Sequence, residues 1–224
     1  MMTSAAAFVR PVEAASVVER VTSEIRSSIL SGRLAPGQEF SLRQIAGQLG
    51  VSFIPVREAL RSLEAEGLLV TRRGRSAVVA PLDADELHSL TRLRGLIEPD
   101  LHVKSCQVIA AEELDRLEQL LQVSNTGGHD TDEAFELYHA FRVGLVAPVA
   151  TAWDLRIMER VWRAMDRYYR IAMSRASEAD VAEADSLRRA LLAAFRERDT
   201  EAVWSATMRR VEFAASMAER SLTP

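Results

Sequence analysis

The hydrophobic residues near the start of the chain are spaced as in a helix. Apolar side chains recur at every fourth position from Val17 to Ile29, which places them on one helical face. Ser16 and Glu19 stand at the start of this helix as a capping box, in which each side chain satisfies the other residue's backbone N–H. Residues 31–40, "SGRLAPGQEF", contain two glycines and a proline, so we expect the helix to end there.

Two further helices are predicted to follow, separated by a tight turn. Ser41 and Gln44 form a second capping box, and Gly50 closes the short helix that they open. Ser52 is placed to cap the next helix, and Pro55 lies in its first turn, where a missing N–H costs little.

A pair of strands is predicted after the third helix. Beyond Gly67 the apolar period changes to two, and "LLVTRRGRSAVVA" is typical of a strand, a glycine-containing turn and a second strand. Three helices and a two-stranded wing describe a winged helix-turn-helix, which we place at residues 15–81. Residues 1–14 are expected to form a mobile tail and not a signal peptide.

The remainder of the chain, residues 82–224, is predicted to be helical. The pattern favours helices near 83–106, 110–124, 131–147, 151–175, 178–197 and 199–220. Since no strand pattern interrupts them, we expect an antiparallel all-α bundle. The fold class is therefore mostly α, with an N-terminal winged helix-turn-helix and a C-terminal helical bundle.

The net charge is divided unevenly between these two parts. Residues 1–80 carry ten Arg and seven Glu, a net charge of +3, whereas the rest carries −7, which gives the overall −4. A basic front part predicts that only the first domain approaches a polyanion.

The composition also excludes several classes of protein. Cys106 is the only cysteine, so no disulfide forms within the chain, and a reducing, cytoplasmic compartment fits best. We expect Cys106 to be a small buried hydrophobe. No apolar run approaches the roughly 18 residues that indicate a membrane span. The sequence has no Gly-rich phosphate loop, nucleophile elbow or metal-ligand cluster, so we do not expect an enzyme.

Two stretches of the chain resemble known families. The string "SILSGRLAPGQEFSLRQIAGQLGVSFIPVREALRSLEAEGLL", followed by "RRGRSAVVAP", closely resembles the N-terminal domain of GntR-family bacterial transcription regulators. The helical part, beginning "LTRLRGLIEPDLHVKSC", looks like the FadR-type C-terminal domain, the FCD domain. The resemblance implies a homodimeric repressor or activator whose helical domain senses a small metabolite. Of the two we expect a repressor, in the cytoplasm, that binds a palindromic operator in double-stranded DNA.

The same resemblance implies which residues contact DNA. Base or near-base contacts are expected from Arg43 and Arg57, whose guanidinium groups are able to reach guanine O6 and N7. Ser52 is expected to anchor a phosphate. The full set of expected DNA-binding residues is Arg43, Ser52, Phe53, Ile54, Pro55, Arg57, Arg61 and the wing residues Arg72, Arg73 and Gly74.

Phe53 and Ile54 depart from the family pattern, in which Arg and then Thr are common at these positions. The change removes one guanine-directed contact and offers apolar contact with thymine methyl groups instead. The alternative is that Phe53 packs against a neighbouring helix and contacts no base. For Arg57 the alternative is a surface ion pair with Glu58, and for the wing arginines it is a solvated turn.

Many FCD domains resemble one another in holding a metal with one aspartate and three histidines, the first two ligands being four residues apart. Alignment by resemblance puts Tyr138, Arg142, Ser186 and Val211 at these four positions. Valine has no ligand atom and arginine stays positively charged, so no metal cofactor is expected.

An arginine in place of the metal suggests a direct anion site. We expect Arg142 to bind a carboxylate or another anionic group of a small effector with two parallel N–H bonds. Arg94, Tyr138, Thr151 and Ser186 are expected to line the same cavity. The alternative is that Arg142 pairs with an acidic side chain inside the bundle. The helical domain would then be a dimerisation module without an effector.

Overall fold

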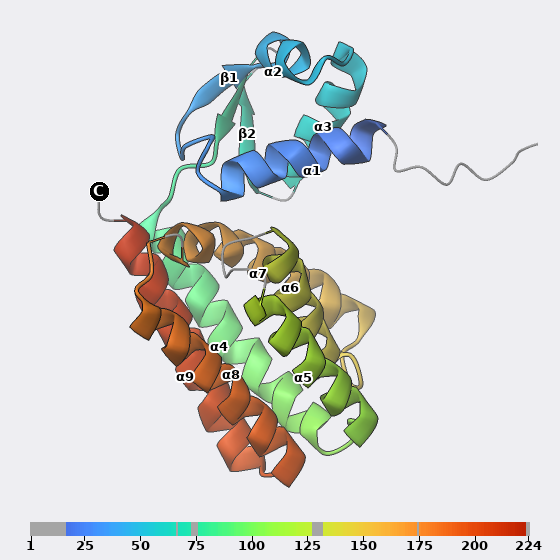
Figure 1. The fold of residues 1–224 in the computed structure, drawn as a ribbon, viewed down its shortest axis with the longest axis vertical. Coiled ribbons are helices and arrows are strands. Elements are labelled where there is room, and N and C mark those ends of the chain that lie inside the picture. The colour runs from blue at the N-terminus through green and yellow to red at the C-terminus, as the bar shows by residue number, and fades with distance from the viewer. Residues whose placement is uncertain (1–16, 66, 73–75, 127–131, 174, 223–224) are drawn as a thin grey trace, which may run out of the picture.

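The computed structural model describes residues 17–65, 67–72, 76–126, 132–173 and 175–222. Figure 1 shows a small N-terminal unit of helices and strands stacked on one end of a larger helical bundle. The mostly α fold class predicted from the sequence is confirmed. The capping box of Ser16 and Glu19 lies partly outside the described residues.

The N-terminal unit is a winged helix-turn-helix. Its elements are α1 (Val17–Leu30), β1 (Glu39–Ser41), α2 (Leu42–Leu49), α3 (Phe53–Ala65), β2 (Leu69–Arg72) and β3 (Ser76–Val79). The three strands form an antiparallel sheet in the order β1-β3-β2. Strand β1 was not predicted, because it has only three residues and exists through its pairing with β3.

The core of this unit lies between the three helices and the sheet. Val56, Leu60 and Leu63 of α3 are buried against α1 residues such as Ile25 and Ile29. This packing sets the direction in which the exposed face of α3 points.

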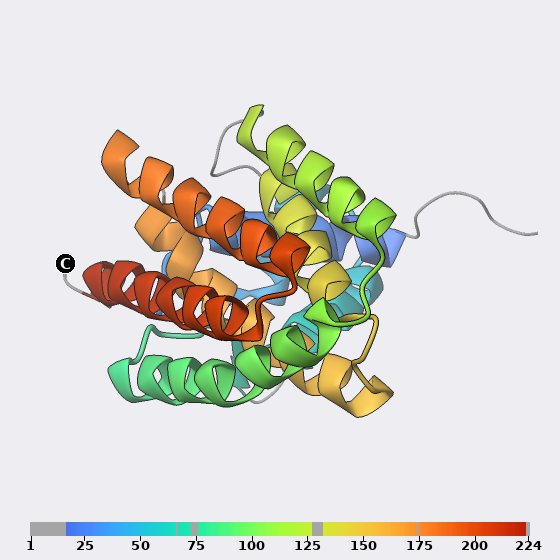
Figure 2. The ribbon, with the colours of Figure 1, turned by 90° about the horizontal axis from the view of Figure 1, so that it is seen from below.

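The C-terminal unit is a helical bundle, as predicted. Its helices are α4 (Ala84–Cys106), α5 (Ala111–Thr126), α6 (Asp132–Val146), α7 (Ala152–Met173), α8 (Glu178–Glu197) and α9 (Thr200–Leu222). Figure 2 shows α9 lying between α4 and α8, with α7 behind them. Cys106 is fully buried, as expected, and its thiol contacts the carbonyl of Val103.

The two units meet along α1 and α7 (Figure 1). Arg167 of α7 is 2% exposed, and its Nη1 donates a 2.9 Å hydrogen bond to the carbonyl of Gly67, in the turn that follows α3. The same guanidinium group forms an ion pair with Glu86 of α4. A charged side chain of the bundle is thereby fixed to the backbone of the N-terminal unit. None of the described helices is both long and apolar enough to span a bilayer.

Candidate functional site

The turn between α2 and α3 is built by local sequence signals. The Ser41 side chain accepts from the backbone N–H of Gln44, and the Gln44 side chain accepts in return from Ser41, so the predicted capping box is confirmed. Gly50 ends α2 with φ +65°, a left-handed conformation that side chains rarely adopt. Helix α3 then begins at Phe53, with Phe53 and Ile54 exposed and Val56 buried in the core.

The described residues expected to contact DNA lie on α2, on α3, in the turn between them and at the end of β2. Six of them are exposed and one, Pro55, is half-buried. The exposed ones are Arg43, Ser52, Phe53, Ile54, Arg57 and Arg61. Arg72 ends β2, and nothing further is described of its side chain; Arg73 and Gly74 lie outside the described residues.

Two alternatives were that Phe53 packs against a neighbouring helix and that Arg57 pairs with Glu58, and either would keep the side chain from contacting DNA. Phe53 is 51% exposed and Ile54 is 69% exposed, so neither is absorbed into the core of the unit. Within the described part of the chain, Arg57 makes no ion pair with Glu58 or any other side chain. All three side chains are therefore accessible to a partner.

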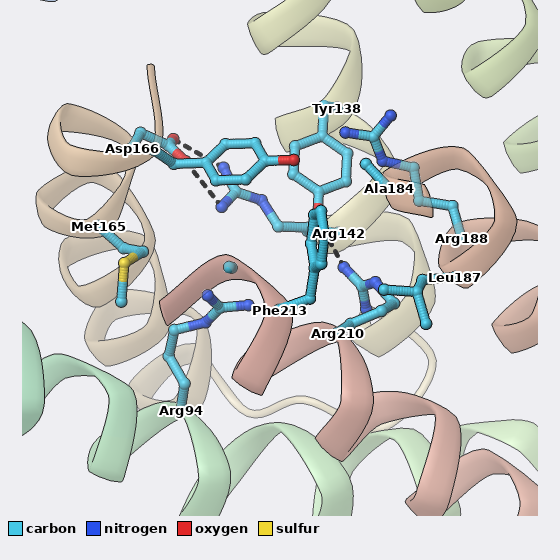
Figure 3. Close-up of a pocket in the computed structure, with 12 residues that line it drawn as sticks. Arg94, Tyr138, Arg142, Met165, Asp166, Ala184, Leu187, Arg188, Arg210 and Phe213 are labelled. Carbon is cyan, nitrogen blue, oxygen red and sulfur yellow. Dashed lines mark hydrogen bonds and ion pairs between the residues drawn. The ribbon is translucent and has the colours of Figure 1, made fainter. Parts of the chain in front are cut away.

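A second candidate site is a cavity enclosed by α4, α6, α7, α8 and α9 (Figure 3). The space in it that a water-sized sphere can enter is about 20 Å³, which is room for a water molecule, so a metabolite binds there only if the lining side chains move apart. The polar lining is Arg94, Tyr138, Arg142, Asp166, Tyr169, Arg188 and Arg210, and the apolar lining includes Met165, Ala184, Leu187, Phe213 and Ala214.

Arg142 pairs with an acidic side chain inside the bundle, which is the alternative to a free anion site given in the sequence analysis. Its Nη1 and Nη2 atoms donate hydrogen bonds of 2.9 and 2.7 Å to the two carboxylate oxygens of Asp166. Arg142 is 3% exposed. It is therefore not an unpaired anion receptor in this structure.

Arg94 is paired in a similar way within α4. Its Nε donates to Oε1 of Glu98 at 2.5 Å, and both side chains are buried. Burial would raise the pKa of Glu98, but the charge and hydrogen bonds of Arg94 outweigh it and lower the pKa to about 2. The indole N–H of Trp162 also donates to Glu98, so this carboxylate is fully engaged.

Tyr138 stands in the middle of the arginines. The guanidinium carbon of Arg188 lies 4.5 Å from the Tyr138 ring centre and that of Arg142 lies 4.8 Å from it. Nη2 of Arg210 donates a 2.7 Å hydrogen bond to the Tyr138 hydroxyl (Figure 3). Burial would raise the pKa of this hydroxyl, but the surrounding positive charges, Arg210 first, lower it to about 7.

The cavity brings together three of the five residues predicted to bind an effector, namely Arg94, Tyr138 and Arg142. The prediction is wrong for the place of Ser186, which is exposed on another face of α8. It is also wrong for Thr151, which lies exposed before α7 and exchanges hydrogen bonds with Asp154 as a helix cap.

Arg188, Arg210 and Asp166 are the cavity residues that the sequence did not single out. Arg188 belongs to the apolar stripe of α8, four residues after Ala184 and three before Leu191. Arg210 holds the same kind of position in α9. An arginine at a buried position of an amphipathic helix is therefore the signal that would have found both.

The cavity does not fit the metal that many FCD domains hold. The alignment placed Ser186 and Val211 at ligand positions, whereas the side chains that face the cavity from α8 and α9 are Arg188 and Arg210. Val211 is buried outside the cavity lining. Arginines do not ligate a cation, and no group of three His, Cys, Asp or Glu suited to a metal occurs among the described residues. The expectation of no metal cofactor stays a prediction.

A neighbouring cavity lies between the two units. It is lined by Arg26 and Leu30 of α1, by Leu68, and by α6 and α7 residues that include His139, Arg163 and Asp166. Asp166 thus contributes to both cavities, one inside the bundle and one at its contact with the N-terminal unit.

An exposed helix-turn-helix joined to a separate helical domain is the architecture of a DNA-binding transcription regulator. The family models agree: residues 17–79 match the bacterial regulatory proteins of the gntR family, and residues 89–213 match the FCD domain. The chain belongs to the GntR family of transcription regulators, in the group that carries an FCD domain.

Individual relatives are more distant. The chain is 26% identical over 198 residues to the HTH-type transcriptional regulator BphR of Paraburkholderia xenovorans (strain LB400), covering 83% of this chain and 80% of that one. It is 23% identical to the regulator McbR of Escherichia coli (strain K12), covering 83% and 85%. The solved structure of E. coli McbR/YncC superimposes with a TM-score of 0.76 at 20% identity, over 92% of this chain and 99% of that one. This similarity supports the fold.

Proposed function

We propose that the protein is a ligand-responsive repressor that binds a palindromic operator as a homodimer and responds to a small anionic metabolite, most simply a carboxylate. The observation that carries the effector is the cluster of four arginines around one cavity of the helical domain. Arg94, Arg142 and Arg188 are paired with carboxylates, whereas Arg210 has no carboxylate partner in the part of the chain that the structure describes. A repressor is the simplest regulator, because a dimer bound across a promoter blocks it without a further partner.

The DNA part of the proposal is supported by the exposed first turn of α3. Arg57 lies one helical turn after Phe53 and Ile54 and supplies a cationic donor beside these two apolar side chains, and Arg43 of α2 is exposed as well. Thymine methyl groups and guanine acceptors both lie in the major groove, where this turn would enter. We expect an operator whose half-site contains thymines opposite Phe53.

The dimer is supported by geometry and by exposed apolar residues. One recognition helix reads only a few base pairs, so a two-fold pair of chains is needed to read a full operator. Leu96, Trp153 and Trp204 of the helical domain are 63%, 67% and 52% exposed. Such side chains suit an interface between copies.

A dimerisation module without an effector is the second candidate function. It is favoured by the carboxylate partners of Arg94, Arg142 and Arg188, because a purely structural ion-pair network would have the same arrangement. The effector-responsive regulator requires that Arg210 binds a ligand, whereas the dimerisation module does not.

The operator test uses fluorescence anisotropy on DNA fragments at several salt concentrations. Arg57→Ala should weaken binding about tenfold and lower the slope of log K against log salt by about one. Arg189→Ala removes the same charge from an exposed position on α8 and should change neither. Equal losses in both variants would argue against α3 as the reading helix.

The effector test uses thermal unfolding of the full chain with a panel of small carboxylates and uncharged analogues. A ligand that binds only the native state raises the midpoint. An anion that raises it in the wild type but not in Arg210→Gln, and that alters operator affinity, would support the proposal. No response to any anion would favour the dimerisation module.

A further inference from the structure

Four arginines line the cavity, and three of them have a carboxylate partner among the described residues. Arg94 pairs with Glu98, Arg142 with Asp166 and Arg188 with Asp185, at 2.5, 2.7 and 2.8 Å. Arg210 is 4% exposed and has no carboxylate partner among the described residues. Its Nη2 donates to the Tyr138 hydroxyl, and its buried Nη1 makes no hydrogen bond there.

Among the described residues, Tyr138 is the acidic group that accepts a hydrogen bond from Arg210. The charged and titratable groups that face it are Arg94 with Glu98 from α4, Arg142 from its own helix α6, Asp166 and Tyr169 from α7, Arg188 with Asp185 from α8, and Arg210 from α9. The apolar cluster around it includes Leu117 and Leu121 of α5. Four guanidinium groups therefore act on one phenol, while the three nearby carboxylates are each engaged by an arginine.

Tyr169 lines the same cavity, but its pKa is shifted in the opposite direction from that of Tyr138. Burial raises the pKa of Tyr169 to about 12, whereas the pKa of Tyr138 is lowered to about 7. Near neutral pH the cavity thus contains one tyrosine that a proton switches between neutral and anionic, and it is the one hydrogen-bonded to Arg210.

We propose that Tyr138 is the internal counter-anion of Arg210, and that the cavity is built for a monoanion that replaces it. This inference rests on the proposed function only in assuming that a ligand enters this cavity. When a monocarboxylate reaches Arg210, the Tyr138 phenolate takes up one proton from solvent and becomes a phenol. One negative charge enters and one is neutralised, so the charge balance of the site is unchanged.

A dianion is disfavoured by the same balance. Its second charge would find the other three arginines already occupied by Glu98, Asp166 and Asp185. Met165, Leu187 and Phe213 line the rest of the cavity and offer contact to an apolar body. The ligand class that these charges and side chains favour is a small monocarboxylate with an apolar remainder.

The proton exchange fixes a pH dependence for binding. Below the pKa of Tyr138, about 7, the phenol is already neutral and affinity for the monoanion is independent of pH. Above it, each bound anion requires one proton, so affinity falls tenfold for each pH unit.

The first measurement is the ultraviolet absorbance of tyrosinate in the full-length protein between about pH 5 and about pH 9. We expect one tyrosine to ionise with a midpoint near 7 in the wild type and in Tyr169→Phe, and none to do so in Tyr138→Phe. Arg210→Gln should raise the midpoint by at least about one unit. This variant keeps the test decisive if Tyr138→Phe does not fold. The absence of any tyrosine ionising in this range overturns the inference.

The second measurement repeats this titration with butyrate and with succinate, at constant ionic strength. These probes have the same number of carbon atoms and differ in charge. Butyrate should raise the Tyr138 midpoint and succinate should raise it less. Equal shifts overturn the monoanion preference, and no shift with either overturns the exchange.

The failure of this inference is distinguishable from that of the proposed function. If a carboxylate alters operator affinity while Tyr138 does not titrate, the proposed function stands and the counter-anion role falls. If butyrate shifts the Tyr138 midpoint while operator affinity responds to no anion, the site stands and the regulatory function falls.

Discussion

Asp166 holds the buried guanidinium group of Arg142 through two hydrogen bonds and at the same time lines the cavity between the two units of the protein. The pair joins α6 to α7, and Asp166 is 14% exposed at its side chain while Arg142 is 3% exposed. The ion pair is thus part of the wall that separates the arginine cavity from the surface facing the N-terminal unit. A change at either residue is expected to affect both cavities.

Removing one member of this pair should destabilise the protein strongly. Arg142→Gln and Asp166→Asn each leave a charge of the pair without its partner in a largely buried place, at an expected cost of about 3 kcal/mol in the free energy of unfolding. The double variant should cost less than the sum of the two, by at least about 1 kcal/mol, because no unpaired charge remains. Urea denaturation of the four proteins measures this, and additive costs would show that the two charges are independent.

Gly144 should be intolerant of a side chain, in contrast to Gly47. A methyl group at Gly144 would lie 2.4 Å from Cδ2 of Leu117, because α6 packs closely on α5 there. We expect Gly144→Ala to lower the free energy of unfolding by about 1–3 kcal/mol. Gly47→Ala, in α2, has no atom within 4 Å and should raise it by up to about 1 kcal/mol, since alanine favours the helix. Similar effects in both variants would contradict this packing.

His102 should make the protein sensitive to acid. It is 1% exposed, and its Nδ1 lies 2.8 Å from Oγ1 of Thr207. Burial lowers its pKa to about 3 from the ordinary value of 6.5. Between these values the unfolded chain binds a proton that the native state does not, so His102 lowers stability as pH falls below 6.5.

The expected slope for this one histidine is about 1.4 kcal/mol per pH unit, measured by urea unfolding at several pH values. His102→Gln keeps a hydrogen-bonding group but does not titrate, so its stability should fall less steeply between about pH 6.5 and about pH 5. His88→Gln is the control, since that histidine lies at the surface with Glu219. An unchanged slope in His102→Gln would refute the assignment.

The fold was largely predictable because it depends on local patterns. Caps such as Ser41 and left-handed glycines such as Gly50 mark helix ends in the sequence itself. Strand β1 escaped prediction because three residues carry no period, and only the pairing of Phe40 with Ala77 makes them a strand.

The site was predictable only in part, because its contacts join distant segments. Arg142 stood out as a charge in a helix, but its partner Asp166 lies 24 residues away on another helix. Arg188 and Arg210 were missed because the alignment compared only the positions of the family's metal ligands. It did not consider which residues lie on the buried face of each helix.

Arg167 should control how firmly the two units are joined. It donates to the carbonyl of Gly67 and pairs with Glu86, so Arg167→Met leaves a backbone acceptor and a carboxylate without this donor. We expect a loss of about 2–4 kcal/mol in the free energy of unfolding, and faster hydrogen exchange in α1, which packs on α7. Arg160→Met, at an exposed position of α7, should change stability by less than about 0.5 kcal/mol. Unchanged exchange in α1 of Arg167→Met would mean that contacts other than those of Arg167 hold the units together.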